Sequence, residues 1–355
     1  MRAPATNSQL TAAQLFRSMV RGTKQGAIMR LVAAVLILCG LGTAAARAQQ
    51  APQDCALKQY GAVDMHVVDD KVFIPATVAG TQRDLLFSIA GTYNHISQDL
   101  AEQLNLSPHP LDRRLPISGK VHYSRAAVVP ELVLGNVKLK DVEFLVVPRD
   151  HAADGPPDDI SLGVFGKVDL ELDMAAHKLK FFSQDHCPGN VVYWTRAFTQ
   201  VPMEVQEFGF IRPKMILDGQ PVTVALNLNE PSHMGMGEAN KLFGLNETSP
   251  GMTQVGTWPD GMNVYRYPFK SLGTEDLKIS NPAIVVLGAP KGKDCSGHQT
   301  MEARDPTHLH TTETDRLATC YGGAGVALGY SVLSKLHMYF SIKEKLMYIS
   351  GAGAN

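Results

Sequence analysis

The stretch VFIPATVAG at residues 72–80, followed by LLFSIAG at 85–91, decides the fold because its pattern recurs later in the chain. The second copy reads FIRPKMILDG at 210–219 and TVALNLN at 223–229. Each copy is an apolar run, a turn glycine and a second apolar run, which is typical of two strands joined by a tight turn. We therefore predict two strand hairpins of the same design.

The two copies also share their internal spacing. Gly80 and Ser88 lie as far apart as Gly219 and Asn227, and both second runs end at the polar residue. Each copy then continues into a segment with the apolar spacing of a short helix. The predicted helices lie at 95–104 and 237–243. Equal spacing of this kind predicts a duplicated module.

At these residues the chain resembles the retropepsin and pepsin-like aspartic proteases, including bacterial exported aspartyl protease-like proteins. In that family the strand pair delivers Asp-Thr-Gly or Asp-Ser-Gly after two apolar residues. Here Ser88 and Asn227 stand in the two aspartate positions, which we call the acid slots. The resemblance implies a mainly β, bilobal fold, with two duplicated antiparallel β-rich lobes, barrel-like sheets and short helices. We place the lobes at 59–187 and 191–352.

A second family element recurs in both halves of the chain. The sequence ISLG at 160–163 resembles the family's apolar-apolar-glycine strand, and ALG at 327–329 repeats it. Patterns of a closing hairpin follow, at 168–182 and 336–349. By this resemblance, Gly163 and Gly329 are the positions at which two backbones cross closely.

The family's reaction depends on two carboxylates that share one proton, so that one activates water while the other donates a proton. Asn227 cannot ionise, and Ser88 needs a base of its own, so we expect no hydrolysis by this route. An alternative catalytic site would use Ser88 as nucleophile and His95 as its base. The simpler interpretation is that Ser88 replaces a catalytic aspartate and has no catalytic role. Asp84 and Asp218 precede the slots and are interpreted as edge and turn carboxylates.

The resemblance further implies an interlobe cleft beneath flap hairpins, the first with its tip at 116–121. An extended peptide can pair its main chain with such flaps. The candidate cleft-lining residues are Phe87, Ser88, Ile89, Ala90, Asn227, Leu228, Asn229, Ser118 and Gly119.

The first 48 residues have the pattern of a secretory signal peptide. They contain six Lys and Arg and no Asp or Glu, and an apolar run at 31–41 leads to Ala46-Arg47-Ala48. Charge, apolar core and small-residue end in this order are typical of a cleaved signal. A membrane anchor is the alternative, but the run is well short of the roughly 20 apolar residues that a spanning helix needs. We therefore predict export, to the periplasm or the medium.

Cleavage after Ala48 leaves 307 residues with 27 Lys and Arg against 34 Asp and Glu, a net charge of −7. A mildly acidic surface without a basic run argues against nucleic acid as a partner. We expect a peptide or protein ligand, no cofactor, no metal, and no stable membrane insertion after cleavage. The sequence does not indicate an oligomeric state.

The four cysteines of the mature chain predict disulfides, because exported proteins meet an oxidising compartment. Three pairings are possible, and position favours Cys55–Cys187 and Cys295–Cys320. The second pair bounds an insertion that we expect at 294–320 in lobe two. By residue type this segment also allows zinc binding, through Cys295 and the histidines His298, His308 and His310.

Three functions remain after this reading. The first is a non-catalytic protease-fold protein, or pseudoenzyme, that binds an extended peptide. The second is an active endopeptidase with a non-standard or partner-completed site, and the third is a disulfide-stabilised structural or interaction module. No Gly-x-Ser-x-Gly, His-Glu-x-x-His or phosphate-loop motif points elsewhere. The acidic segment at 150–159 is interpreted as a solvated loop, since it lacks the ligand spacing of a calcium loop.

Overall fold

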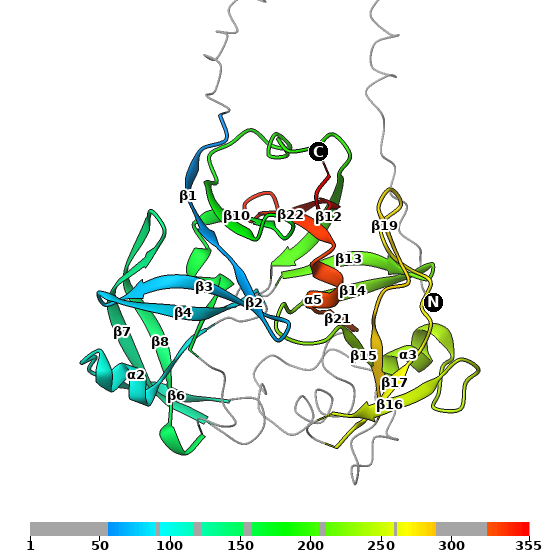
Figure 1. Cartoon of the computed structure of the whole chain (residues 1–355), viewed down its shortest axis with the longest axis horizontal. Helices are drawn as coiled ribbons and strands as arrows, with labels where there is room; N and C mark the ends of the chain where they lie inside the picture. The colour runs from blue at the N-terminus through cyan, green and yellow to red at the C-terminus, as the bar shows by residue number, and fades with distance from the viewer. Residues whose placement is uncertain are drawn as a thin grey trace, which may run out of the picture. The chain divides into compact units, whose positions relative to one another are not determined.

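The structure is a computed structural model, and its described residues fall within one compact unit, Asp54–Asn355 (Figure 1). It describes residues 56–89, 93–116, 122–151, 158–205, 211–258, 261–288 and 325–354. Several sequence predictions fall outside these residues: the signal peptide at 1–48, Ala90, the flap tip with Ser118 and Gly119, and the insertion at 294–320.

The first half of the chain forms an eight-stranded sheet in the order β2-β3-β4-β9-β5-β8-β7-β6. Its strands are β2 (His66–Val68), β3 (Lys71–Val78), β4 (Thr81–Ser88), β5 (Asn94–Ser97), β6 (His109–Pro116), β7 (His122–Leu134), β8 (Val137–Val147) and β9 (Asp159–Ser161). Helix α2 (Gln98–Gln103) follows β5, and the 3-10 turns are η1 (Arg149–His151) and η2 (Leu162–Phe165).

A second sheet runs in the order β1-β11-β10-β22-β23-β12-β13-β14-β21-β15-β20-β17-β16, and β18 and β19 branch from β13. Its strands are β1 (Gln59–Asp64), β10 (Val168–Asp173), β11 (Lys178–Ser183), β12 (Thr199–Val205), β13 (Ile211–Leu217), β14 (Gln220–Leu226), β15 (His233–Gly235), β16 (Thr253–Thr257), β17 (Asn263–Arg266), β18 (Ser271–Gly273), β19 (Lys278–Ser280), β20 (Val285–Leu287), β21 (Val326–Leu328), β22 (Leu336–Ser341) and β23 (Leu346–Gly351). Its helices are α3 (Met236–Phe243) and α5 (Tyr330–Leu333).

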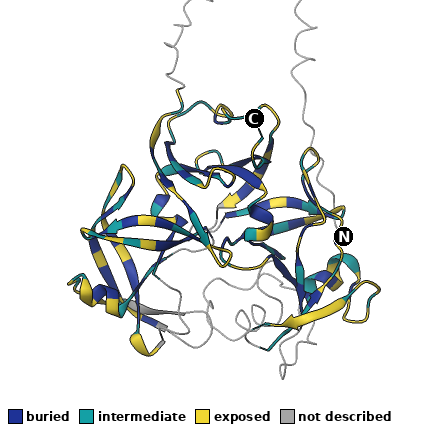
Figure 2. Ribbon diagram, in the orientation of Figure 1, coloured by how far each residue is buried: buried dark blue, intermediate teal, exposed yellow. Residues whose placement is uncertain are grey.

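The two predicted hairpins are β3–β4 and β13–β14. Buried and exposed residues alternate along β3 and β13, as expected of strands with one face in the core (Figure 2). The turns are Ala79-Gly80 and Asp218-Gly219, and all four residues have positive φ. Such turns match the twist of the strands and favour glycine at the second position.

A parallel strand lies beside each hairpin. β4 pairs with β9, with Phe87 opposite Ile160, and β14 pairs with β21, with Leu226 opposite Leu328. The elements that follow these parallel strands correspond in order between the two halves: η2 to α5, β10 to β22, and β11 to β23. The same number of residues separates the members of each pair. We call 71–183 the first repeat and 211–351 the second repeat.

The register corrects the prediction for Gly163. Phe87 and Leu226 are counterparts in the two hairpins, so their partners Ile160 and Leu328 are counterparts as well. The residue that follows is Ser161 in the first repeat and Gly329 in the second. Gly163 therefore lies two positions beyond the counterpart of Gly329. At the position where the motif predicts glycine, the first repeat has Ser161.

Two local predictions in the first repeat also need correction. Residues 94–97 form β5, which pairs in parallel with β8, so the helix starts only at Gln98. Its N-cap is Ser97, whose hydroxyl accepts a hydrogen bond from the amide of Leu100. The acidic loop ends earlier than predicted, because Asp159 is only 5% exposed and begins β9. In the second repeat, α3 confirms the helix expected at 237–243.

The two repeats share one sheet where β10 pairs with β22. One face of this sheet joins a hydrophobic core that includes side chains of both repeats. On the other, a smaller core gathers Phe182, Tyr339 and Tyr348 with Val191 and Trp194 of the connecting segment.

Cys187, which lies in this connecting segment, is disulfide-bonded. The other cysteines lie outside the described residues, so the predicted pairings stay predictions. None of the helices in the described part of the chain has the length and hydrophobicity needed to span a bilayer.

Candidate functional site

The two acid slots occupy matching places in the repeats. Ser88 ends β4 opposite Ser161 of β9. Asn227 follows β14, and its amide donates to the carbonyl of Leu328 at 2.9 Å. Both slot residues are partly exposed. Their positions are those in which the resemblance implies catalytic aspartates, and neither side chain carries a carboxylate.

Asn229 links the second slot loop to the first repeat. Its Oδ1 accepts a hydrogen bond from the amide of Val72 at 3.1 Å, and its Nδ2 donates to the carbonyl of Phe87 at 2.9 Å. Its own amide donates to Asn227 Oδ1 at 3.1 Å. The Asn227 side chain is therefore engaged in shaping its loop, and Asn229 fixes that loop against β3 and β4.

Three of the predicted cleft-lining residues pack inward instead. Phe87, Ile89 and Leu228 are at most 1% exposed and belong to the hydrophobic core. The reason is alternation: in an extended segment, a residue next to an outward-facing polar one faces the opposite side. The prediction assigned these apolar neighbours of the slots to the wrong face.

A histidine–aspartate pair, with the aspartate buried and the histidine partly exposed, lies beside the first slot. His95 Nδ1 is 2.9 Å from Asp159 Oδ1 and 3.0 Å from Oδ2, and the His95 amide donates to Oδ1 at 2.8 Å. Burial raises the pKa of the Asp159 carboxyl, and the hydrogen bonds and charge of His95 oppose that rise. Asp159 stands next to Leu86 in the register, so it lies on the strand beside the one that ends at Ser88, and His95 lies on the next strand beyond.

Tyr123 closes this pair from one side, with its ring centroid 5.0 Å from that of His95. Burial raises the pKa of the Tyr123 hydroxyl, and the negative charge of Asp159 adds to the rise. Sequence reasoning missed both Asp159 and Tyr123. The available signal for Asp159 was its place directly before the apolar residue of the β9 strand.

The second repeat has a histidine in the corresponding position, without an acid. His233 stands opposite Ala327, as His95 stands opposite Asp159. Among the described residues no carboxylate pairs with His233, and its Nδ1 lies 2.9 Å from the carbonyl oxygen of Pro231. The ring centroid of Trp258 lies 5.5 Å from that of His233.

A polar side chain supports each strand behind the slots. Asn94 Oδ1 accepts from the amide of Ser161 at 2.9 Å, and Ser232 Oγ accepts from the amide of Gly329 at 2.8 Å. At Gly329 a Cβ atom would lie 1.8 Å from the carbonyl oxygen of Glu230. Glycine is therefore required here by close backbone contact, as the resemblance implies for the second repeat.

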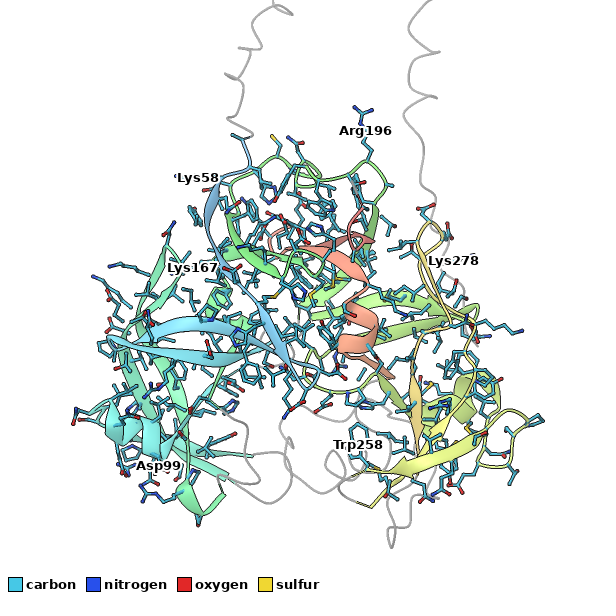
Figure 3. All side chains as sticks on the ribbon, in the orientation of Figure 1. Lys58, Asp99, Lys167, Arg196, Trp258 and Lys278 are labelled. Carbon is cyan, nitrogen blue, oxygen red and sulfur yellow. The ribbon has the colours of Figure 1, made fainter. Side chains whose placement is uncertain are left out.

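Strand β16 offers an open edge at the end of the second sheet. All five of its residues are exposed (Figure 2), and among the described strands it pairs with β17 alone. Trp258 follows it directly (Figure 3). Exposed backbone groups on such a strand can pair with another extended chain.

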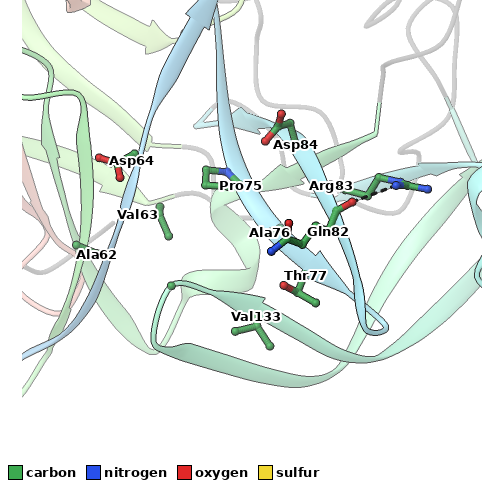
Figure 4. A pocket seen from close by; sticks show the side chains of 11 residues that line it. Ala62, Val63, Asp64, Pro75, Ala76, Thr77, Gln82, Arg83, Asp84 and Val133 are labelled. Atoms are coloured by element: carbon green, nitrogen blue, oxygen red, sulfur yellow. Dashed lines mark hydrogen bonds between the residues drawn. The ribbon is translucent and has the colours of Figure 1, made fainter.

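A cavity of about 670 Å³ lies elsewhere, among β1, β3, β4 and the end of β7. Figure 4 shows Asp64, Arg83 and Asp84 around it, together with apolar side chains such as Val133. Neither slot residue lines this cavity, and neither does His95 or Asp159. It is therefore separate from the site built around the slots.

Residues 74–164 match the family model described as aspartyl protease. This match contains most of the β3–β4 hairpin, Ser88, the His95–Asp159 pair and β9. The chain has an aspartic protease-like fold. The duplicated hairpins and their parallel partner strands extend this protease-like design to the second repeat, beyond the matched residues.

Solved structures are similar at low identity. Conglutin gamma, a basic 7S globulin from lupine seeds, is 10% identical with a TM-score of 0.44, covering 84% of this chain and 96% of that one. Basic 7S globulin from soybean is 9% identical with a TM-score of 0.43 and the same coverage. Aspartic proteinase from Irpex lacteus is 8% identical with a TM-score of 0.45, covering 82% and 97%. No curated protein matches this chain.

Proposed function

We propose that this chain is an exported protein of aspartic protease-like fold that binds an extended peptide without hydrolysing it by the two-carboxylate mechanism. The observation that carries the proposal is the pair of slots, which hold Ser88 and Asn227. Water activation there needs a carboxylate that accepts a proton and a second that donates one. Loss of general acid-base catalysis alone costs about 100- to 10,000-fold in rate.

The surroundings of the slots support this reading. No side-chain hydrogen bond joins Ser88 to any described residue, so no described base is in contact with its hydroxyl. Asn227 Oδ1 is already occupied by the amide of Asn229. The slot loops are thus held in place by amide hydrogen bonds, and neither slot residue carries a group that ionises.

Peptide binding is inferred from the open edge of β16 and from Trp258 at its end. An extended ligand that pairs with this edge places its main chain near the rings of Trp258 and His233. Main-chain pairing supplies affinity with little dependence on ligand sequence.

Binding is tested with a pool of labelled extended peptides and the same pool methylated at its backbone nitrogens. We expect saturable anisotropy with the first pool, a change in Trp258 fluorescence, and little binding of the second. Trp258→Phe should remove the fluorescence change while anisotropy still reports binding. Equal binding of both pools would contradict main-chain pairing.

Cleavage is tested with a peptide library between pH 3 and 8. We expect the native chain to be inert, and we compare it with the double variant Ser88→Asp, Asn227→Asp. The change Asn227→Asp keeps an oxygen for the amide of Asn229, so the loop bond stays available. Cleavage by the native chain would contradict the proposal, whereas cleavage by the double variant alone would support it strongly.

A second candidate function is hydrolysis assisted by His95. Asp159 at Nδ1 orients the ring as a carboxylate orients the base of a nucleophilic hydrolase, and it leaves Nε2 to accept a proton. If the native chain cleaves, His95→Gln should abolish cleavage, and the pH profile should follow one group that acts as a base. His233→Gln is the matched control from the second repeat.

A further inference from the structure

The connecting segment at 184–198 joins β11 of the first repeat to β12 of the second and contacts both repeats. On the first repeat, its Tyr193 hydroxyl donates to Glu171 Oε1 at 3.0 Å. On the second, its Trp194 Nε1 donates to Ser350 Oγ at 2.9 Å. The segment therefore braces the repeats where β10 and β22 share a sheet. None of these residues contributes to the proposed function.

A buried ionisable pair fastens the start of this segment to β10. His186 Nε2 lies 2.7 Å from Asp169 Oδ2, and the two side chains are 2% and 0% exposed. The other oxygen of Asp169, Oδ1, accepts from the amide of Ile342 at 3.0 Å. Among the described residues, no Lys or Arg forms an ion pair with Asp169. The imidazole is thus the partner that can balance its charge.

Both nitrogens of the His186 ring face oxygen atoms. Nδ1 lies 3.2 Å from the carbonyl oxygen of Cys187, which can only accept a hydrogen bond. A neutral imidazole carries one hydrogen, so beside an ionised Asp169 it would turn a lone pair toward one of these oxygens. The buried carboxylate would also lack a counter-charge. One further proton removes both costs, whether the ring or the carboxyl carries it.

We propose that the His186–Asp169 pair keeps this further proton in the folded chain and acts as a pH-sensitive latch that holds the connecting segment on the shared sheet. The proton belongs to the pair, because closely interacting groups titrate together. Its loss leaves Asp169 charged beneath the segment and a lone pair of His186 against an oxygen. The segment then loosens, and the brace between the repeats weakens.

The other ionisable groups around the pair are engaged elsewhere or stay neutral. The Tyr339 hydroxyl of β22 donates to Asp169 Oδ2 at 3.3 Å, and burial raises its pKa, so it keeps its hydrogen. Glu171 of β10 holds the Lys180 ammonium at 2.6 Å. Further titratable side chains of the surrounding elements are Asp185 and Tyr193 of the connecting segment, His337 of β22, Lys343 and Glu344 of the turn that follows, and Tyr348 of β23.

The latch has a pH dependence of defined sign. In an unfolded chain, histidine loses its proton near about pH 6.5, where aspartate is already ionised. The folded pair keeps one proton more, so its contribution to stability is full below about pH 6.5 and is lost as pH rises through the titration of the folded pair. Burial raises the pKa of the Asp169 carboxyl, in the same direction, while the hydrogen bond with His186 opposes the rise. One proton changes the unfolding equilibrium constant by at most about tenfold per pH unit.

Trp194 reports the state of the segment directly. The chain has two tryptophans, and Trp258→Phe leaves Trp194 alone. In the full chain with this change, we measure the quenching of Trp194 emission by acrylamide from pH 5 to 9. We expect weak quenching below about pH 6.5, and a rise of about twofold or more as local opening exposes the ring at higher pH.

Two variants assign the titration. In Asp169→Asn the amide oxygen accepts from Ile342, and the amide nitrogen donates to Nε2 of a neutral His186 ring. Every hydrogen bond is then kept without the further proton, so we expect weak quenching up to pH 9. His186→Gln removes the imidazole and should remove the pH step with strong quenching throughout. His66→Gln, at an exposed histidine 3.5 Å from Asp84, should keep the native step.

Two outcomes overturn the proposal. One is native quenching that stays constant from pH 5 to 9, with protection factors of the amides at 184–198 that do not fall in hydrogen exchange. The other is a step that persists in both Asp169→Asn and His186→Gln. That result would assign the titration to His337, whose ring centroid lies 4.0 Å from that of Trp194. Circular dichroism identifies a variant that fails to fold, in which case the other variant and native hydrogen exchange decide.

Discussion

The two repeats have the same backbone but different polar residues at matching positions. The hairpins β3–β4 and β13–β14, the parallel strands β9 and β21, and the closing hairpins correspond throughout. Beside the slots, however, Asp159 of the first repeat is replaced by Ala327, and Ser161 by Gly329. The frame depends on turn geometry and alternation, which many side chains satisfy. The chemistry depends on single residues, and these have diverged.

The shared sheet shows the same divergence in another form. At matching positions, Asp169 and Glu171 of β10 correspond to His337 and Tyr339 of β22. The acidic strand thus lies against a strand that offers hydrogen-bond donors: His337 to Glu171, and Tyr339 to Asp169. A duplicated pair of strands has become complementary, so the repeats now depend on each other.

Gly329→Ala should produce the largest loss of stability. Its Cβ would meet backbone atoms of Glu230 and Ser232, which cannot give way as a side chain can. We expect the free energy of unfolding to fall by about 3 kcal/mol in chemical denaturation. The counterpart Ser161→Ala loses only a hydroxyl contact to Asn94 and should cost about 1 kcal/mol. Equal losses would contradict the inference that the backbone is packed more tightly at Gly329 than at Ser161.

Asn229→Ala should follow in size. It removes two hydrogen bonds between the repeats and leaves the amide of buried Val72 without its acceptor. We expect a loss of about 2 kcal/mol, measured by denaturant unfolding. Asn190→Ala changes an exposed asparagine and should stay within about 0.5 kcal/mol. A loss no greater than this control would show that the bridge contributes little.

Asp159→Asn should remove a pH dependence that the second repeat lacks. Burial raises the pKa of Asp159 in the folded chain, so the folded state holds a proton that the unfolded chain releases. Native stability from this group is full below its unfolded pKa and is lost as pH rises through the folded pKa. The difference between native and variant curves should slope by at most about 1.4 kcal/mol per pH unit. Parallel curves would contradict the shift.

Ser97→Ala should give the smallest of these effects. Ser97 caps α2 through its hydroxyl, whereas Gly235 at the start of α3 makes no side-chain cap bond. We expect a loss of about 1 kcal/mol in thermal unfolding. Ser97→Thr keeps the acceptor and should recover most of it. If both variants lose the same amount, the cap bond is not the cause.

The sequence by itself determined the duplicated hairpins. Turn glycines at Gly80 and Gly219, and the equal distances to Ser88 and Asn227, come from local rules of turns and alternation, which act within a few residues. These rules also found α3, and the family resemblance implied the crossing at Gly329. They misplaced the first helix because residues 94–97 can form either element, and pairing with β8 makes them a strand.

Only the tertiary structure decided which polar groups meet. Asp159 was assigned to a solvated loop, yet β9 carries it against His95, 64 residues away in the chain. Glu171 and His337 are 166 residues apart, and they meet only because strands of the two repeats pair. No local pattern encodes such contacts, since they depend on the register of strands that are distant in sequence. The physical reason is that side-chain chemistry acts over a few ångströms of space, whereas sequence patterns describe neighbours along the chain.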